Sequence, residues 1–299
     1  MQAERKTKAC FCFSEAPPIL RASALSSLPI LRASIGKCTF AADMGQRYFI
    51  VFSYDGTRYH GWQIQPNDIS VQEVMTERMR CLFGPDFSLT GAGRTDAGVH
   101  ARRMVAHFDL NQPLVNPEAM VDKLNSMFPD DIVVHGIRPV KSDAHARFDA
   151  LSRTYEYTFD LGKDPFMRLY ATHLTQLPDV AAMNEAASVL SEYQDFTSFS
   201  KVHTDVKTFI CKIFRAEWRQ SGNLLVFTIE ADRFLRNMVR AIVGTMLEVG
   251  RHKMDIQAFR HVIEQKDRCS AGTSMPPQGL CLTGIRYPDD VFCDILEDK

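Results

Sequence analysis

The stretch Gly91-Ala92-Gly93-Arg94-Thr95-Asp96-Ala97-Gly98-Val99-His100 is the most informative part of this 299-residue chain. Glycine has no Cβ, so three glycines in so short a segment let the backbone turn sharply and pass close to a ligand. Apolar, strand-like residues flank the segment on both sides. A carboxylate two residues after an arginine on such a loop indicates a carboxylate held in a defined place rather than a solvated one. The alternative is an Asp that caps the next element.

The glycine spacing does not fit the common nucleotide-binding loops. A dinucleotide fingerprint requires a third glycine where Asp96 stands, and a P-loop ends in Gly-Lys-Ser/Thr, which this stretch does not contain. Residues 104–110 alternate as in a strand, so no helix N-terminus follows the loop to receive a phosphate. Nucleotide-cofactor functions are therefore weakly supported.

The Asp96 loop resembles the catalytic motif of the TruA-type tRNA pseudouridine synthases. The likeness extends to four further segments, which occur in the family's order between about Gln46 and Pro288. They are Tyr54–Gln63 (YDGTRYHGWQ), Arg147-Phe148 with Arg153–Tyr157 (RTYEY), Phe234–Gly250 (FLRNMVRAIVGTMLEVG) and Gly279–Leu282 (GLCL). Several long matches in order make the resemblance specific.

The resemblance implies an α+β pseudouridine synthase fold. Two pseudo-symmetric halves share a mostly antiparallel central sheet with helices packed on it, and the active-site cleft lies between the halves. The implied reaction is isomerisation of uridine to pseudouridine at positions 38, 39 and 40 in the anticodon arm of tRNA, with an Asp nucleophile and a flipped base. The family is homodimeric, with tRNA across both subunits. Since side chains supply the nucleophile and its partner, no cofactor or metal is expected.

The resemblance assigns the nucleophile to Asp96 and its charge partner to Arg240. A carboxylate that is desolvated for catalysis tends to lose its charge, and an adjacent guanidinium opposes that loss through a charge-assisted pair. Arg240 lies one residue beyond an apolar helical stripe. Its alternative interpretation is a solvated helix residue or a phosphate contact.

Three further residues are predicted to bind the substrate, two of them from the resemblance. Tyr155 corresponds to the ring that stacks on the flipped uracil, and Leu280 to the apolar wall of the base pocket. Without the resemblance, both would be ordinary strand residues that pack in the core. Arg94 is predicted to enter the space that the flipped base leaves, because extruding a base costs about a few kcal/mol. A phosphate clamp is the alternative for Arg94.

Composition permits these expectations without requiring them. The formal net charge is −1, whereas many nucleic-acid-binding domains are basic, but Lys and Arg gather near the motifs. The eight cysteines include no Cys-x-x-Cys pair and no Cys/His cluster with zinc spacing, which is the usage of a reducing cytoplasm. No apolar run is long enough to cross a bilayer.

Residues 1–43 differ from the rest of the chain. They are rich in Ala, Ser and Pro, and Pro-Ile-Leu-Arg-Ala-Ser occurs twice, at 18–23 and 29–34. We expect a disordered or non-native extension rather than a targeting peptide, because clean amphipathicity and a cleavage site are missing. The catalytic domain is expected to follow as an N-terminal half (44–145) and a C-terminal half (146–299).

Hydrophobic periodicity predicts the elements of both halves. A capping box at Ser70 and Glu73 predicts a helix start, and Pro117 stands at a tolerated first helical position. The predicted strands are 48–54, 104–110, 132–140, 153–159, 209–218, 224–230 and 280–287, and the predicted helices are 71–82, 116–127, 180–193, 234–249 and 255–264.

Two other function classes compete with the synthase. One is a tRNA-binding or folding module without activity, which the joint presence of Asp96, Tyr155 and Arg240 opposes. The other is a nucleosidase or glycosidase using Asp96. Such an enzyme needs a second carboxylate across the bond, and the motifs offer no convincing one.

Overall fold

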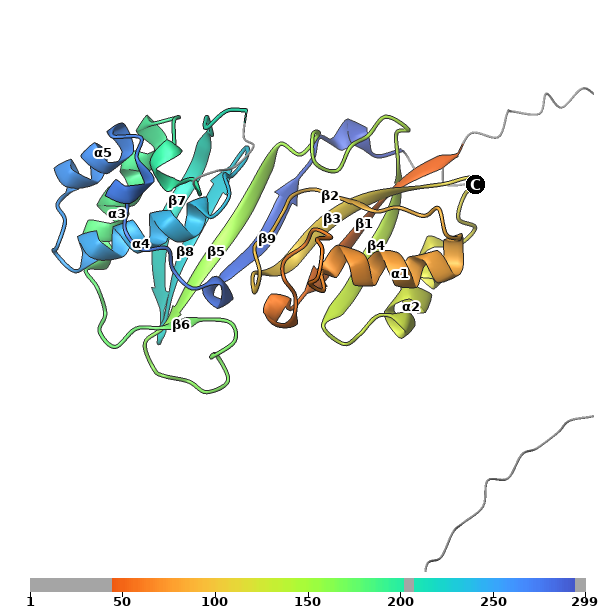
Figure 1. Cartoon of the computed structure of the whole chain (residues 1–299), viewed down its shortest axis with the longest axis horizontal. Helices are drawn as coiled ribbons and strands as arrows, with labels where there is room; N and C mark the ends of the chain where they lie inside the picture. The colour runs from red at the N-terminus through yellow and green to blue at the C-terminus, as the bar shows by residue number, and fades with distance from the viewer. Residues whose placement is uncertain (1–44, 202–206, 294–299) are drawn as a thin grey trace, which may run out of the picture. The chain divides into compact units, whose positions relative to one another are not determined.

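The computed structural model describes residues 45–201 and 207–293. Its central feature is a sheet in the order β4-β1-β3-β9-β5-β8-β7, with β2 added beside β3 and β6 beside β5 (Figure 1). The strands are β1 (Gln46–Tyr54), β2 (Thr90–Gly91), β3 (His100–Leu110), β4 (Ile132–Val140), β5 (Ser152–Asp160), β6 (Thr172–His173), β7 (Ile213–Ser221), β8 (Leu224–Ala231) and β9 (Leu280–Arg286).

Most strand pairs are antiparallel, as predicted. The exceptions are β3 with β9 and β5 with β6, which run parallel and make the sheet mixed. Parallel strands cannot be joined by a tight hairpin, so both parallel pairs join segments that are distant in the chain or separated by a long loop. The β3–β9 pair places the last strand in sequence in the middle of the sheet (Figure 1).

The helices begin at the signals that the sequence carries. Ser70 and Glu73 form the predicted capping box, in which the Ser70 hydroxyl accepts from the Glu73 N–H and the Glu73 carboxylate accepts from the Ser70 N–H. Asn116 caps the second helix by accepting from the Ala119 N–H. The helices are α1 (Val71–Phe83), α2 (Pro117–Met127), α3 (Val180–Val189), α4 (Met238–Gly250) and α5 (Ile256–Glu264).

Each half buries its own apolar core. The core of the first half includes residues of β1, β3, β4 and α1, and the core of the second half includes residues of β5, β7, β8, α3, α4 and α5. Figure 1 shows α1 and α4 on the same face of the sheet, one over each half.

The two cores exchange residues across the middle of the sheet. Leu282 and Ile285 of β9 pack in the core of the first half, although they come from the end of the chain, and Val99 packs in the core of the second. The described residues consequently form one compact unit. The expected α+β fold, with helices packed on a shared sheet, is confirmed.

Several element ends differ from the prediction. The predicted helix 234–249 begins only at Met238, because Asn237 has φ +66°, a left-handed conformation that a helix interior does not accept. The Asn237 amide donates to the Ser274 hydroxyl, which holds this conformation. The predicted strand 209–218 begins at Ile213, and β3 begins at His100, earlier than the alternation suggests.

The predicted extension 1–43 lies outside the described residues. Within the described ranges, no helix is long and apolar enough to span a membrane.

Candidate active site

The Asp96 loop connects β2 to β3 in the first half of the catalytic domain. Its start is tied down by the Ala92 N–H, which donates to the Val105 carbonyl at 2.8 Å. Its end is a turn in which the Val99 N–H donates to the Asp96 carbonyl at 3.2 Å and Gly98 takes φ +75°. Glycine adopts that conformation without the strain that a Cβ would add. Asp96 therefore lies on a short loop that is held at both ends.

The segment Tyr54–Gln63 packs against this loop at Thr95. The Tyr54 hydroxyl is 2.8 Å from the Thr95 hydroxyl, and the Trp62 N–H donates to the Thr95 carbonyl at 3.3 Å. A Cβ on Gly61 would lie 2.3 Å from that same carbonyl oxygen, so only glycine allows the approach. This motif holds the residue next to Asp96 in place. Trp62 is buried and Gln63 is exposed, and neither is a catalytic candidate.

Two arginines face the Asp96 carboxylate. Arg240 Nη1 lies 3.4 Å from Asp96 Oδ2, and Arg236 Nε lies 3.6 Å from Asp96 Oδ1. The side chain of Arg240 is 18% exposed, that of Asp96 27%, and that of Arg236 59%. The structure thus brings together the predicted pair Asp96 and Arg240, and it adds Arg236 on the other carboxylate oxygen.

The Arg240 side chain is held by residues 273–275, a segment that passes alongside α4. Arg240 Nε donates to the Met275 carbonyl at 2.6 Å, and the Met275 N–H donates to the Arg240 carbonyl at 3.1 Å. This segment runs so close to the helix that a Cβ on Gly244 would meet the Thr273 carbonyl oxygen at 1.9 Å. Arg240 is therefore neither a solvated helix residue nor a free cation, and its guanidinium is aimed at Asp96.

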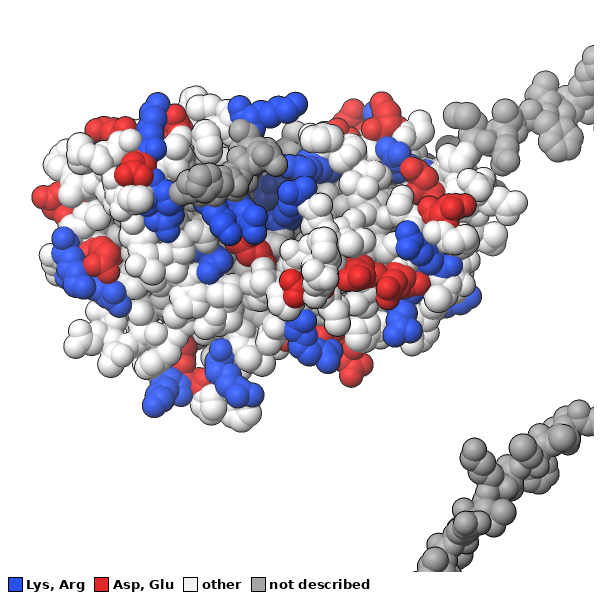
Figure 2. All heavy atoms as spheres, viewed as in Figure 1, with Lys and Arg blue, Asp and Glu red and all other residues white. Residues whose placement is uncertain are grey.

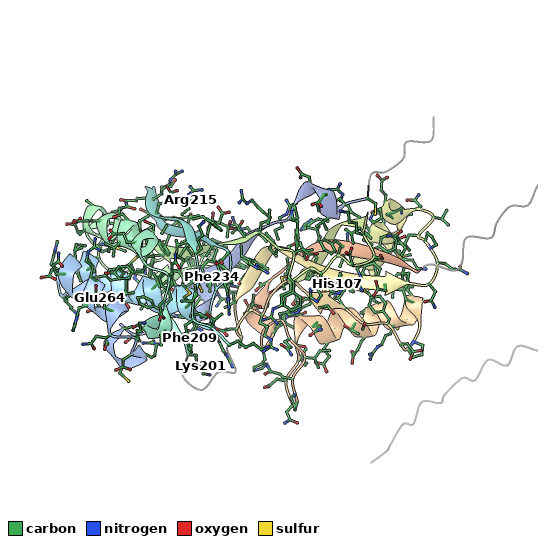
Figure 3. The ribbon with its side chains drawn as sticks, turned by 90° about the horizontal axis from the view of Figure 1, so that it is seen from above. His107, Lys201, Phe209, Arg215, Phe234 and Glu264 are labelled. Atoms are coloured by element: carbon green, nitrogen blue, oxygen red, sulfur yellow. The ribbon has the colours of Figure 1, made fainter. Side chains whose placement is uncertain are left out.

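Tyr155 lies in the middle of the sheet, on β5, at an irregularity in its pairing with β9. The register shifts between Thr154 and Tyr155, and such bulges turn a side chain away from its regular direction. The Tyr155 ring packs edge-on against Phe234, with centroids 5.2 Å apart. In Figure 3, Phe234 lies near the middle of the molecule, between Glu264 of the second half and His107 of the first. Tyr155 lines the cleft described below, whereas Tyr157 and Phe159 of the same strand are fully buried core residues.

Burial raises the pKa of Tyr155, and the Asp96 charge raises it further, whereas Arg153 opposes the shift. The Tyr155 side chain is consequently a neutral phenol at physiological pH.

Leu280 and Arg94 complete the set of predicted residues. Leu280 begins β9, pairs with Tyr157 and is 6% exposed, and it lines the same cleft as Tyr155. Arg94 is exposed at the cleft, and its guanidinium has no hydrogen bond or ion pair within residues 45–201 and 207–293.

A cleft of about 1960 Å³ unites these side chains, and residues of both halves line it. Its cations greatly outnumber its carboxylates, and Figure 2 shows Lys and Arg gathered near the middle of this face. Cationic walls of this kind attract a polyanion and hold phosphates. The lining cations are Arg94, Arg147, Arg153, Lys201, Lys207, Arg233, Arg236, Arg240 and Arg268, and the lining carboxylates are Asp68, Asp96 and Asp232.

The family follows from sequence comparison combined with this site. The family model described as tRNA pseudouridine synthase matches residues 50–149 and 190–288, which is more than half of the chain and includes Asp96 and Arg240. The chain belongs to this family.

Curated relatives named tRNA pseudouridine synthase A resemble the chain over nearly their whole length. The relative from Bacteroides thetaiotaomicron is 56% identical over 83% of this chain and 93% of its own. The relative from Bacteroides fragilis is 55% identical over 83% of this chain and 98% of its own. The relative from Geobacter sulfurreducens is 38% identical over 80% and 98% respectively.

Two residues of this family member were not predicted to serve the site. Arg236 faces Asp96 although it precedes α4, because the left-handed Asn237 separates it from the helix, and so helical periodicity gave no signal for this contact. Arg153 donates to four carbonyls, those of Ala92, Arg147, Ala150 and Asp232. Arg153 lies in a segment that carries the family resemblance, but neither its spacing nor its neighbours in the sequence predict these four contacts. No group of three or more potential metal ligands occurs among the described residues.

Proposed function

We propose that this protein isomerises uridine to pseudouridine at positions 38, 39 and 40 in the anticodon arm of tRNA, with Asp96 as the nucleophile. The observation that carries the proposal is a single carboxylate on a braced loop, held by the anchored Arg240 at 3.4 Å, in a cleft whose walls are cationic. The names of the relatives supply the substrate class, a tRNA uridine.

The chemistry needs an ionised carboxylate in a partly enclosed site. The N1–C1′ glycosidic bond breaks, the base turns, and a C5–C1′ bond forms. The C5 proton leaves and N1 gains one, so the atoms balance without another reactant. A carboxylate such as Asp96 can hold the reacting group covalently between these steps. Arg240 stabilises the negative charge of Asp96.

The remaining predicted residues would hold the flipped nucleotide. The Tyr155 ring offers a face for the uracil, and Leu280 offers an apolar wall beside it. Arg94 has a guanidinium without a protein partner in the described part of the chain, and it lies two residues from Asp96. It is therefore available to fill the space that the flipped base leaves or to bind a phosphate there.

The other cleft carboxylates favour an isomerase over a two-carboxylate hydrolase. Asp232 Oδ1 accepts from the N–H groups of Lys212 and Arg233, both at 2.7 Å, and so it is committed to the backbone. Asp68 lies 3.5 Å from the ring of His60, on a different loop. These contacts oppose a role for either residue as the second carboxylate of a glycosidase.

Tritium release from tRNA that carries uracil labelled at C5 tests the proposal. An isomerase releases the label as water, a nucleosidase releases free base, and a binding module releases neither. Asp96→Asn should abolish turnover and change tRNA affinity by about three-fold or less, because the amide keeps the shape but is not a nucleophile. Retention of more than a trace of activity by purified Asp96→Asn would exclude Asp96 as the nucleophile.

The oligomeric state and compartment are also proposals. The family resemblance supports a homodimer that binds tRNA across both subunits. The molar mass from light scattering of the protein as it leaves a size-exclusion column would test the dimer. The cysteines of the described residues are all free, which supports a reducing compartment such as the cytoplasm.

A further inference from the structure

An exposed aromatic ring stands at the edge of the cleft and has no role in the proposed chemistry. Phe148 lies in the turn between β4 and β5, lines the cleft and is 75% exposed. A large apolar side chain exposed on one residue is common on protein surfaces. Phe148 differs because the backbone beneath it is tightly held.

The turn that carries Phe148 is built around His145. The Nδ1 atom of His145 accepts from the N–H groups of Arg147 at 3.1 Å and Phe148 at 3.4 Å, and the His145 N–H donates to Asp149 at 2.7 Å. The turn is also fastened to the sheet, because the Ala146 N–H donates to Nδ1 of His107 at 3.1 Å. The ring is thus presented in a fixed place rather than on a loose loop.

The Phe148 ring packs against His145 and is otherwise largely exposed. The His145 ring lies against it, with centroids 4.3 Å apart and planes inclined by 38°. Burial lowers the pKa of His145, as do the charges of Arg47 and Arg147, while Asp149 opposes them. The imidazole is therefore neutral, as its accepting Nδ1 requires, and the stack is a rigid support for a second flat group.

A cation accompanies the ring. The guanidinium carbon of Arg147 lies 5.8 Å from the centroid of the Phe148 ring, and Arg147 is exposed at the cleft. Within the described ranges its guanidinium has no hydrogen bond or ion pair. An exposed aromatic ring beside a free arginine is the pairing that binds a base and its phosphate in single-stranded nucleic acid.

Arg153 connects this ring to the catalytic loop. One nitrogen, Nη2, donates both to the Arg147 carbonyl and, at 3.1 Å, to the Ala92 carbonyl at the start of the Asp96 loop. One half-buried side chain thus links the turn that carries Phe148 to the start of the Asp96 loop. An RNA base stacked on Phe148 would therefore set the position of the RNA strand that enters the active site.

We propose that Phe148 is a stacking platform for an unpaired base of the tRNA, a neighbour of the target uridine, and that Arg147 contacts the phosphate beside that base. The proposal rests on the proposed function, which supplies a substrate with unpaired loop nucleotides. Phe148 is a positioning residue, since it acts on the register of the RNA and not on the reacting atoms.

A double-mutant cycle between protein and RNA tests the contact. Binding is measured between Asp96→Asn protein and an anticodon stem-loop RNA, in which each loop nucleotide is replaced in turn by an abasic residue. Phe148→Ala should weaken binding of the unmodified RNA by about ten-fold or more. At one abasic position, which is not the target uridine, the same substitution should cost less than about two-fold, because the stacked base is already gone.

Matched variants distinguish aromatic stacking on Phe148 from a contact that any apolar side chain could make. Phe148→Trp should bind the RNA within about three-fold of the parent, whereas Phe148→Leu should lose as much affinity as Phe148→Ala. Phe166→Ala is the control, since Phe166 is 86% exposed but does not line the cleft. Equal binding by Phe148→Leu and the parent, or additivity at every abasic position, would overturn the platform. Failure of the parent Asp96→Asn protein to bind the stem-loop would overturn the proposed substrate as well.

Discussion

The two arginines at Asp96 differ in how firmly they are held. Arg240 is mostly buried and anchored by the Met275 carbonyl, whereas Arg236 is 59% exposed. Water and salt screen an exposed ion pair more strongly than a buried one. Arg240 is thus the permanent partner of the carboxylate. We expect Arg236 to exchange its contact with Asp96 for an RNA phosphate when the substrate binds, because its side chain is exposed.

Substitution of each arginine by methionine should separate these roles. Arg240→Met should lower kcat by about 100-fold or more, because it leaves Asp96 without its buried partner. Arg236→Met should lower kcat less than about three-fold, raise KM, and reduce the salt dependence of tRNA binding by about one phosphate contact. Single-turnover rates and binding at several salt concentrations measure both effects. If both variants lost the same factor in kcat and neither changed the salt dependence of tRNA binding, the two arginines would not have separate roles.

The pKa of Tyr155 bears on its part in the reaction. Burial and the Asp96 charge raise it, so the phenol ionises only above its ordinary value of about 10. A phenolate is therefore not the base at neutral pH, and the ring is expected to contribute chiefly by stacking.

Tyr155→Phe and Tyr155→Leu test that expectation. Tyr155→Phe should keep tRNA affinity and show the same pH–rate profile as the parent below about pH 9, since the lost hydroxyl does not titrate there. Tyr155→Leu should lose most activity because the flat face is gone. A basic limb that disappears in Tyr155→Phe would show that the hydroxyl titrates during catalysis.

At the scale of elements, the Asp96 loop depends on the segment before α1. Gly61 has φ +90°, and its missing Cβ leaves room for the Thr95 carbonyl. Gly61→Ala combines backbone strain with a clash against backbone, for a loss of about 3 kcal/mol in unfolding free energy. Because the clash is with the residue next to Asp96, kcat should fall as well.

Gly93→Ala is the matched control within the same loop. Nothing lies within 4 Å of a Cβ at Gly93, and its φ is not in the left-handed region. The unfolding free energy should change by less than about 0.5 kcal/mol, because the added methyl meets no other atom. Denaturant midpoints of the two variants measure the difference. Equal stability of Gly61→Ala and Gly93→Ala would refute the close approach.

The sequence predicted elements where the pattern was local and missed what tertiary contacts imposed. The capping box at Ser70 and Pro117 at a helix start are local signals, and both are confirmed. The start of α4 was wrong because Asn237 is held left-handed by Ser274, thirty-seven positions later in the chain. The same irregular segment carries Arg236 to Asp96, and so that contact could not be read from periodicity alone. The Phe148 turn also depends on distant partners such as His107.

At the scale of the whole described unit, β9 joins the two halves. It pairs in parallel with β3 and antiparallel with β5, and its Leu282 packs in the core of the first half. Arg153 adds a second link by donating to the Ala92 carbonyl. A chain of this length commonly unfolds in more than one step. The shared strand predicts instead that neither half keeps its packing when the other unfolds.

The chain has two tryptophans, and each reports on one half. Trp62 packs in the core of the first half and Trp218 in that of the second. In Trp62→Phe and in Trp218→Phe, the remaining tryptophan's fluorescence and the far-UV circular dichroism should change at the same denaturant concentration. Adding Leu282→Ala should cost about 3 kcal/mol and move the Trp218 transition as far as the Trp62 transition, although Leu282 packs in the other core. A Trp218 midpoint that stays in place while that of Trp62 falls would show two units that unfold independently.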